Sequence, residues 1–267
     1  MIAGILPTLR HVAGATYKVP ASGGGGGSVS SLADVNTLIT NLGGNSGVIG
    51  FWDCRLNVTS ASLSVSAWGD CRTAPGGGAL NTMSLAGTGT APTIASANQP
   101  IVFAASGSQY LATVSNTGLY NAAGPVTMLA VCASAATSDT NGIGGYDATT
   151  NAFEIATNAT PDYTGVVGST PTTLTSTVAA STTLRAFILK VNGSGTISLT
   201  VSNGTPVTAS GVGFGTDTTS RMTLGSTAGS GTVLGNTWAA VALFNFYTNS
   251  SQDTTLYNWA VANHAAT

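Results

Sequence analysis

Few residues in this 267-residue chain could carry out acid–base chemistry on a substrate. Glu154 is the only glutamate, and no second acidic residue stands two positions before or after it. Glycoside hydrolysis usually requires two carboxylates that lie about 5–9 Å apart. The sequence therefore predicts that Glu154 is a solvent-facing residue of a strand and not a catalytic acid.

A nucleophilic serine activated by histidine is equally poorly supported. The two histidines, His11 and His264, stand near opposite ends of the sequence, whereas a serine nucleophile needs its base within hydrogen-bond reach. His264 falls in the last turn of a predicted helix, where a partner of the helix dipole or a packed edge residue is expected. We therefore predict that the chain is not an enzyme.

The three cysteines are too few for a disulfide scaffold. Cys132 lies in an apolar run and is expected to act as a small buried hydrophobe. Cys54 and Cys71 flank a predicted hairpin and could face each other, so a disulfide and two free thiols both remain open.

Oxygen ligands for calcium are present, but their spacing does not specify a site. Asp139, Asn141 and Asp147 surround a glycine-rich stretch, and a hairpin would bring Asp53 toward Asp70. Asp and Asn in such stretches usually form turns. We predict no cofactor, with calcium at Asp139, Asn141 and Asp147 as the alternative.

Three tyrosines in turn-rich stretches are the candidates for stacking against a sugar. They are Tyr120, Tyr146 and Tyr163. The alternative for each is a partly buried aromatic residue at the end of a strand. The four tryptophans are mostly better explained as core residues.

The composition excludes several classes of partner. Charged residues make up 6% of the chain and the net charge is -2, which gives no electrostatic basis for binding nucleic acid or an anionic membrane. No run approaches the roughly 20 apolar residues that span a membrane. Hydrophobic residues make up 43%, which argues against disorder. Abundant Ser, Thr, Asn, Gly and Ala favour short strands joined by turns.

Period-two alternation between turn signals predicts an all-β domain with two facing antiparallel sheets. Residues 238–246 are apolar on both faces, so this strand should lie inside a layered domain, covered by a helix over residues 251–263 with Ser250 as its N-cap. A second helix is predicted over residues 31–42, and no internal repeat is found. The strands are predicted near residues 48–52, 63–68, 83–86, 100–104, 110–114, 126–134, 143–147, 152–156, 163–167, 184–191, 196–201, 221–225 and 238–246.

Residues 1–27 form a predicted N-terminal arm, and residues 28–267 form the domain. Glycines 23–27 are expected to be a flexible joint between the two. The arm before them is too apolar for an idle leader and too short for its own core. We therefore predict that residues 1–22 attach the chain to partner subunits, by strand addition to a sheet edge. The attachment side chains are Ile2, Ile5, Leu6, Leu9, Val12, Tyr17 and Val19.

Several short blocks, taken in order, resemble concanavalin A-like, laminin-G-like jelly rolls over residues 47–267. The blocks are Phe51-Trp-Asp-Cys-Arg-Leu56, Ser66-Ala-Trp-Gly-Asp70, Pro92-Thr-Ile94, Gln99-Pro-Ile-Val-Phe103, Ser108-Gln-Tyr-Leu111 and Leu256-Tyr-Asn-Trp259. This chain departs from the family where many members have Asp-Gly after the Phe of the fourth block, since Ala104 and Ala105 follow Phe103. It also has Cys54 where the first block commonly ends in an acidic residue and alanine. Both departures remove polar groups that could orient a ligand or ion.

Such jelly rolls are often attached to bacteriophage particles. The resemblance therefore implies a non-enzymatic virion structural protein, which decorates a capsid or tail through its arm as part of a multi-subunit assembly. The alternative function is a glycan-binding adhesin or receptor-binding protein that mediates host attachment. The jelly-roll loops would then bind a host surface glycan.

Overall fold

The structure is a computed structural model, and the residues that it describes carry the account that follows. They are residues 32–44, 47–72, 81–87, 89–104, 109–113, 125–134, 142–148, 152–158, 160, 162–213, 220–225 and 236–267. For residues 142–148, 152 and 220 the description covers the backbone alone.

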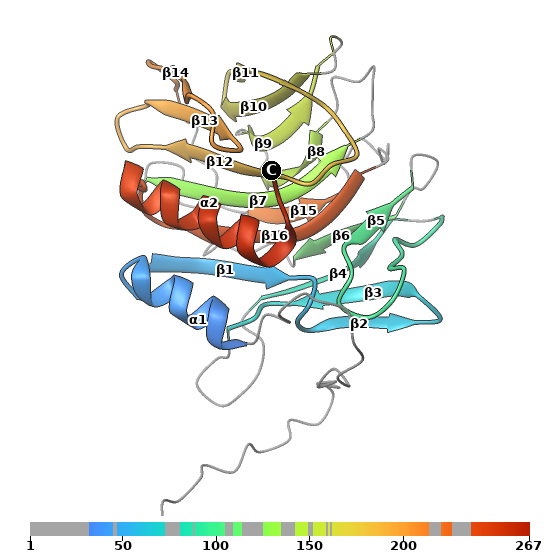
Figure 1. Ribbon diagram of the computed structural model, residues 1–267. Helices are drawn as coiled ribbons and strands as arrows, with labels where there is room; N and C mark the ends of the chain where they lie inside the picture. The colour runs from blue at the N-terminus through green and yellow to red at the C-terminus, as the bar shows by residue number, and fades with distance from the viewer. Residues whose placement is uncertain are drawn as a thin grey trace, which may run out of the picture.

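Two antiparallel sheets face each other, and two helices cover the outside of one of them (Figure 1). The seven-stranded sheet has the order β1 (Val48–Asp53), β16 (Asn236–Phe244), β7 (Val126–Ser134), β12 (Arg185–Val191), β13 (Ile197–Val201) and β14 (Val207–Ala209), with β5 (Ile101–Phe103) also paired to β16. The nine-stranded sheet has the order β11 (Thr172–Ala179), β10 (Asp162–Gly168), β9 (Ala152–Thr157), β8 (Gly142–Ala148), β15 (Ser220–Leu224), β6 (Tyr110–Thr113), β4 (Thr82–Ala86), β3 (Ser64–Gly69) and β2 (Val58–Ala61). The predicted all-β sandwich of the jelly-roll type is confirmed.

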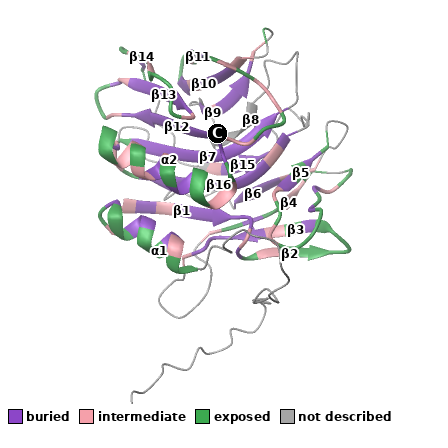
Figure 2. Ribbon diagram, viewed as in Figure 1, coloured by how far each residue is buried: buried purple, intermediate pink, exposed green. Residues whose placement is uncertain are grey.

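The two apolar strands β7 and β16 form the centre of the seven-stranded sheet. All nine residues of β7 are buried, and Thr237 is the only residue of β16 that is not fully buried. The helices α1 (Leu32–Asn41) and α2 (Ser250–His264) lie on the outer side of this sheet. Figure 2 shows the buried residues along its strands and on the helix sides that face it. The prediction of a strand covered on both faces is confirmed, although it ends at Phe244 and not at residue 246.

The first turn of α2 differs in one detail from the prediction. Asn249 is the N-cap, because its Oδ1 accepts the backbone N–H of Gln252 at 2.9 Å and Gln252 Oε1 accepts the N–H of Asn249 at 2.9 Å. The prediction of Ser250 as the cap was wrong by one residue. Asp253 does not serve the helix dipole alone, since its Oδ2 lies 2.6 Å from Lys190 Nζ on β12. This ion pair fastens the start of α2 to the sheet.

The two sheets enclose a core of large aromatic residues. Trp52, Trp68 and Trp238 are fully buried, as the sequence predicts for the tryptophans. Tyr163 of β10 packs edge-on against Phe187 of β12, with ring centroids 4.7 Å apart. The predicted burial of Cys132 is confirmed, and Cys54 and Cys71 are buried free thiols. In the described part of the chain, no helix has the length and apolarity needed to cross a membrane.

Candidate functional site

Two copies of the tripeptide Asp-Cys-Arg place buried ion pairs next to β1. The first copy, Asp53-Cys54-Arg55, begins at the last residue of β1, and the second copy, Asp70-Cys71-Arg72, follows β3. In each copy the aspartate Oδ1 accepts the backbone N–H and the Nε–H of the arginine two residues on, at 2.9–3.1 Å. The other carboxylate oxygen pairs with the arginine Nη2. No internal repeat was predicted from the sequence, although the repeated tripeptide Asp-Cys-Arg was a signal that could have pointed to these two ion pairs.

The second copy closes the outer edge of β1. Arg72 donates to the carbonyl oxygens of Val48 and Ile49, and Asp70 Oδ1 accepts the N–H of Phe51 at 3.2 Å. Side chains thus satisfy backbone groups that an edge strand would otherwise leave open for pairing. That Asp53 and Asp70 share a calcium ion stays a prediction from the sequence; in the structure each carboxylate pairs with its own arginine.

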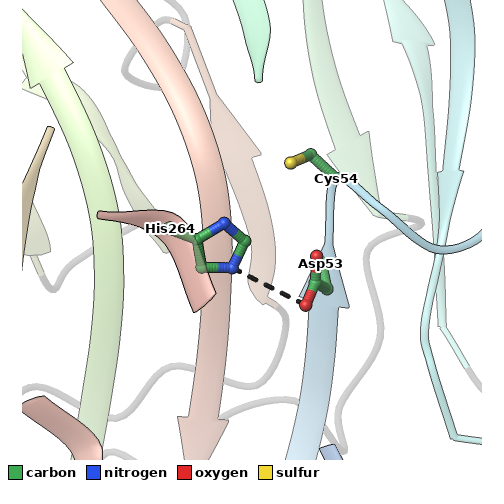
Figure 3. Close-up of side chains that lie close together, drawn as sticks. All are labelled: Asp53, Cys54 and His264. Carbon is green, nitrogen blue, oxygen red and sulfur yellow. Dashed lines mark ion pairs between the residues drawn. The ribbon is translucent and has the colours of Figure 1, made fainter. Parts of the chain in front are cut away.

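The first copy joins the end of β1 to the end of α2. Arg55 Nη1 donates to the carbonyl oxygen of Asn263 at 3.0 Å, which places a positive charge at the C-terminus of the helix. His264 Nε2 lies 3.6 Å from Asp53 Oδ2 (Figure 3). The His264 ring also packs against Trp259, with centroids 5.2 Å apart. His264 is therefore a packed residue, with 3% of its side chain exposed.

Burial sets the protonation states in this cluster. Burial raises the pKa of the Cys54 thiol well above its usual value and lowers that of His264. Burial alone would also raise the pKa of Asp53, but hydrogen bonds from Arg55 and the charge of the neighbouring groups lower it to about 2. Asp70 differs, because burial raises its pKa despite the hydrogen bonds from Arg72. At neutral pH the first cluster therefore holds an ionised Asp53, a protonated thiol and a neutral imidazole.

Cys54, His264 and Asp53 have the residue types of a nucleophilic catalytic triad. Their surroundings do not suit that chemistry. A cysteine nucleophile acts as a thiolate that a substrate can reach. Cys54 is 2% exposed and its thiol keeps its proton, and Asp53 is already paired with Arg55. The cluster therefore does not provide a hydrolytic site. Its three donor atoms nevertheless lie within 4.8 Å of one another, which is considered below.

The outer face of the nine-stranded sheet gathers a different set of groups. On this face the strand register lines up one residue from each of seven strands in a row across the sheet. The neighbours of these residues along each strand point inward, and most of those described are buried. The inward residues include Phe153, Ile155, Leu111, Met222 and Met83. The row consists of Thr173, Val166, Glu154, Gly145, Thr223, Ala112 and Ser84. Thr173 and Ser84 of this row are exposed, Val166 and Glu154 are half-buried, and Thr223 and Ala112 are buried.

Two larger side chains lie on the same face, each two positions from this row. Arg221 precedes Thr223 on β15, and Tyr110 precedes Ala112 on β6. The guanidinium carbon of Arg221 lies 5.9 Å from the centroid of the Tyr110 ring, and both side chains are half-buried. We call Tyr110, Arg221, Glu154 and Ser84 the sheet-face site. It combines an aromatic ring with a cation, a carboxylate and a hydroxyl group.

The site residues predicted from sequence have mixed outcomes. Tyr163 was wrong as a stacking residue, because its ring is fully buried and its hydroxyl donates to Ser181 O at 3.1 Å and accepts from Ser134 N at 3.2 Å. Tyr146 and Asp147 lie on β8, for which the backbone alone is described. The remaining predicted residues lie outside the described part of the chain: Ile2, Ile5, Leu6, Leu9, Val12, Tyr17, Val19, Tyr120, Asp139 and Asn141.

Comparison with solved structures shows the kind of fold. Trypanosoma rangeli sialidase matches with a TM-score of 0.57 at 15% identity, over 84% of this chain and 34% of that one. The binding domain of Paraclostridial Mosquitocidal Protein 1 matches with 0.56 at 10% identity, over 80% of this chain and 52% of that one. The receptor-binding domain of botulinum neurotoxin mosaic serotype C/D matches with 0.56 at 10% identity, over 79% and 50%.

These matches show that the chain has a lectin-like β-sandwich fold. The chain spans about a third of the sialidase and about half of each toxin domain. No family model matches the sequence, and no curated protein matches it.

Proposed function

We propose that the chain is a non-catalytic recognition module that binds glycans through the sheet-face site. The observation that carries this proposal is the combination, on one face of a lectin-like sandwich, of the Tyr110 ring with the polar groups of Arg221 and Glu154. Small-molecule sites are typically built from an apolar surface and a few placed polar groups. A sugar presents an apolar face and several hydroxyl groups, so this set matches its chemistry.

Among the side chains that the structure describes, this face shows no second carboxylate beside Glu154; Asp147, on the neighbouring strand β8, is described by its backbone alone. The direct cross-strand neighbours of Glu154 are Gly145 and Val166, so neither supplies a second carboxylate beside it. Asp53, Asp70 and Asp253 are held in ion pairs elsewhere. The likeness to a sialidase covers only a third of that protein at 15% identity, and it supports the fold and not the reaction. Recognition without cleavage is the function that this arrangement favours.

Two of the solved structures with this fold are named as binding or receptor-binding domains of toxins. They support the adhesin-like function over the virion function. The attachment role of residues 1–22 and a location in the virion stay predictions from the sequence, and glycan binding does not depend on them.

The proposal is tested by removing the aromatic ring. The Tyr110→Ala variant should bind at least about tenfold more weakly than the natural chain to the glycan that a glycan array identifies, a loss of about 1.4 kcal/mol. Affinity would be measured by titration calorimetry. Tyr257→Ala, on α2 across the sandwich, is the matched control and should bind normally. If a folded Tyr110→Ala variant and the natural chain bound the glycan with equal affinity, the glycan would bind elsewhere and the sheet-face site would be wrong.

A further inference from the structure

We propose that Asp53, Cys54 and His264 form a binding site for a single zinc-like divalent ion. This ion would fasten the end of β1 to the end of α2. The inference is independent of glycan binding, because the cluster lies at α2, on the outside of the seven-stranded sheet, while the sheet-face site lies on the other sheet.

The donor atoms are already close together. One carboxylate oxygen, one imidazole nitrogen and the Cys54 sulfur lie within 4.8 Å of one another, and they come from two segments far apart in the sequence (Figure 3). With zinc–ligand distances of about 2.0–2.3 Å, two ligands of one tetrahedral ion are about 3.3–3.7 Å apart. The 3.6 Å between His264 Nε2 and Asp53 Oδ2 falls in this range.

The imidazole gives a second and independent observation. Among the described residues, His264 Nε2 has no hydrogen-bond partner, although only 3% of the His264 side chain is exposed to solvent. Buried polar atoms normally have a partner, so each exception calls for an explanation. The pair at 3.6 Å is too long for a hydrogen bond but suits two ligands of a shared ion. A bound ion would give Nε2 the partner that it lacks.

Arg55 is compatible with this ion. It pairs with both oxygens of the Asp53 carboxylate: Nε–H donates to Oδ1 at 2.9 Å, and Nη2 contacts Oδ2, the oxygen that faces His264. Each carboxylate oxygen has a second lone pair, and carboxylates that bind metals are commonly hydrogen-bonded as well. With the ion bound, the two negative charges of Asp53 and the Cys54 thiolate exceed the one positive charge of Arg55. The bound ligand set together with Arg55 therefore carries a net charge of one negative unit, which offsets part of the charge of a divalent ion.

The donor set selects the class of ion. Sulfur, nitrogen and oxygen together suit zinc and its close relatives, whereas calcium and magnesium are bound by oxygen alone. Binding breaks the S–H bond of Cys54, forms a bond between sulfur and the metal, and releases one proton to solvent. Three protein ligands leave a fourth position, which water fills in zinc sites of this kind.

Cobalt(II) is the probe that tests the site, because a thiolate bound to cobalt absorbs in the near ultraviolet through charge transfer. Titration of the metal-free full chain with cobalt(II) should produce this absorption at one equivalent, and zinc(II) should abolish it. Cys54→Ser should lose the absorption, while Cys71→Ser and Cys132→Ser should keep it. Circular dichroism would establish that each variant is folded.

His264→Gln is the second variant, and it leaves every cysteine in place. It should weaken cobalt binding at least about tenfold, since one of three protein ligands is lost. Absence of the charge-transfer absorption in the natural chain would overturn the proposal. The proposal would also be overturned if the absorption persisted in Cys54→Ser, or if His264→Gln bound cobalt with unchanged affinity.

Discussion

Replacing Asp70 with alanine is expected to lower the free energy of unfolding by about 3–5 kcal/mol, because it removes one partner of a buried ion pair. Asp70 is fully buried, and only 10% of the Arg72 side chain is exposed. The variant would leave this guanidinium without its counter-charge and the N–H of Phe51 without its acceptor. Urea unfolding followed by tryptophan fluorescence measures the change.

Two further variants isolate the cause. Asp70→Asn keeps an oxygen that can accept the N–H of Phe51 but removes the charge, so it should cost less than alanine. Asp162→Ala removes a half-buried carboxylate that accepts from the Thr160 hydroxyl, and should cost about 1 kcal/mol or less. If Asp70→Ala is no more harmful than Asp162→Ala, the buried pair does not secure the edge of β1.

The second large effect is expected at Gly225, which follows β15. Its φ is +92°, and a Cβ there would lie 2.2 Å from Cδ1 of Phe103, a residue that is 1% exposed. Gly225→Ala would therefore combine backbone strain of about 1–2 kcal/mol with overpacking of about 1–3 kcal/mol. We expect a total loss of about 3 kcal/mol, measured by the same unfolding experiment.

Gly211 offers a matched control for this substitution. Its φ is +78°, and none of the described residues comes within 4 Å of the position of a Cβ. Gly211→Ala should therefore show the backbone strain alone, about 1–2 kcal/mol. Equal losses at Gly211 and Gly225 would mean that the Phe103 ring moves aside without cost.

Much of the fold could be predicted because apolar runs are strong signals. The strands β7 and β16 are apolar on both faces, and the hairpin of β12 and β13 has a clear turn between its strands. Three strands were missed. In β11 most outward residues are threonines, β2 is short and largely exposed, and β14 has three residues, of which one is exposed and two are half-buried. Alternating Ser and Thr residues occur in loops as well as in strands, so the sequence pattern alone did not identify these three strands.

The candidate sites were harder to predict, because they depend on tertiary pairing. Arg55 and Asn263 are 208 positions apart, and nothing local indicates that Asp53 meets His264. Tyr163 lies in a turn-rich stretch of the sequence, which led to its prediction as a surface residue. Its hydroxyl instead forms hydrogen bonds with backbone groups of Ser134 and Ser181 inside the sandwich. The sheet-face site is defined by strand register, which joins β9, β8, β15 and β6 across the sheet. The order of these strands could not be read from their sequences.

The most direct test of glycan recognition is to map the chemical shifts of the isotope-labelled chain during titration with the glycan that the array identifies. We predict that the shifts change along β6, β15 and β9, around Tyr110, Arg221 and Glu154, and that the glycan is recovered intact. The resonances of α1 and α2 should stay unchanged. Changes confined to the helices, or cleavage of the glycan during the titration, would contradict the account.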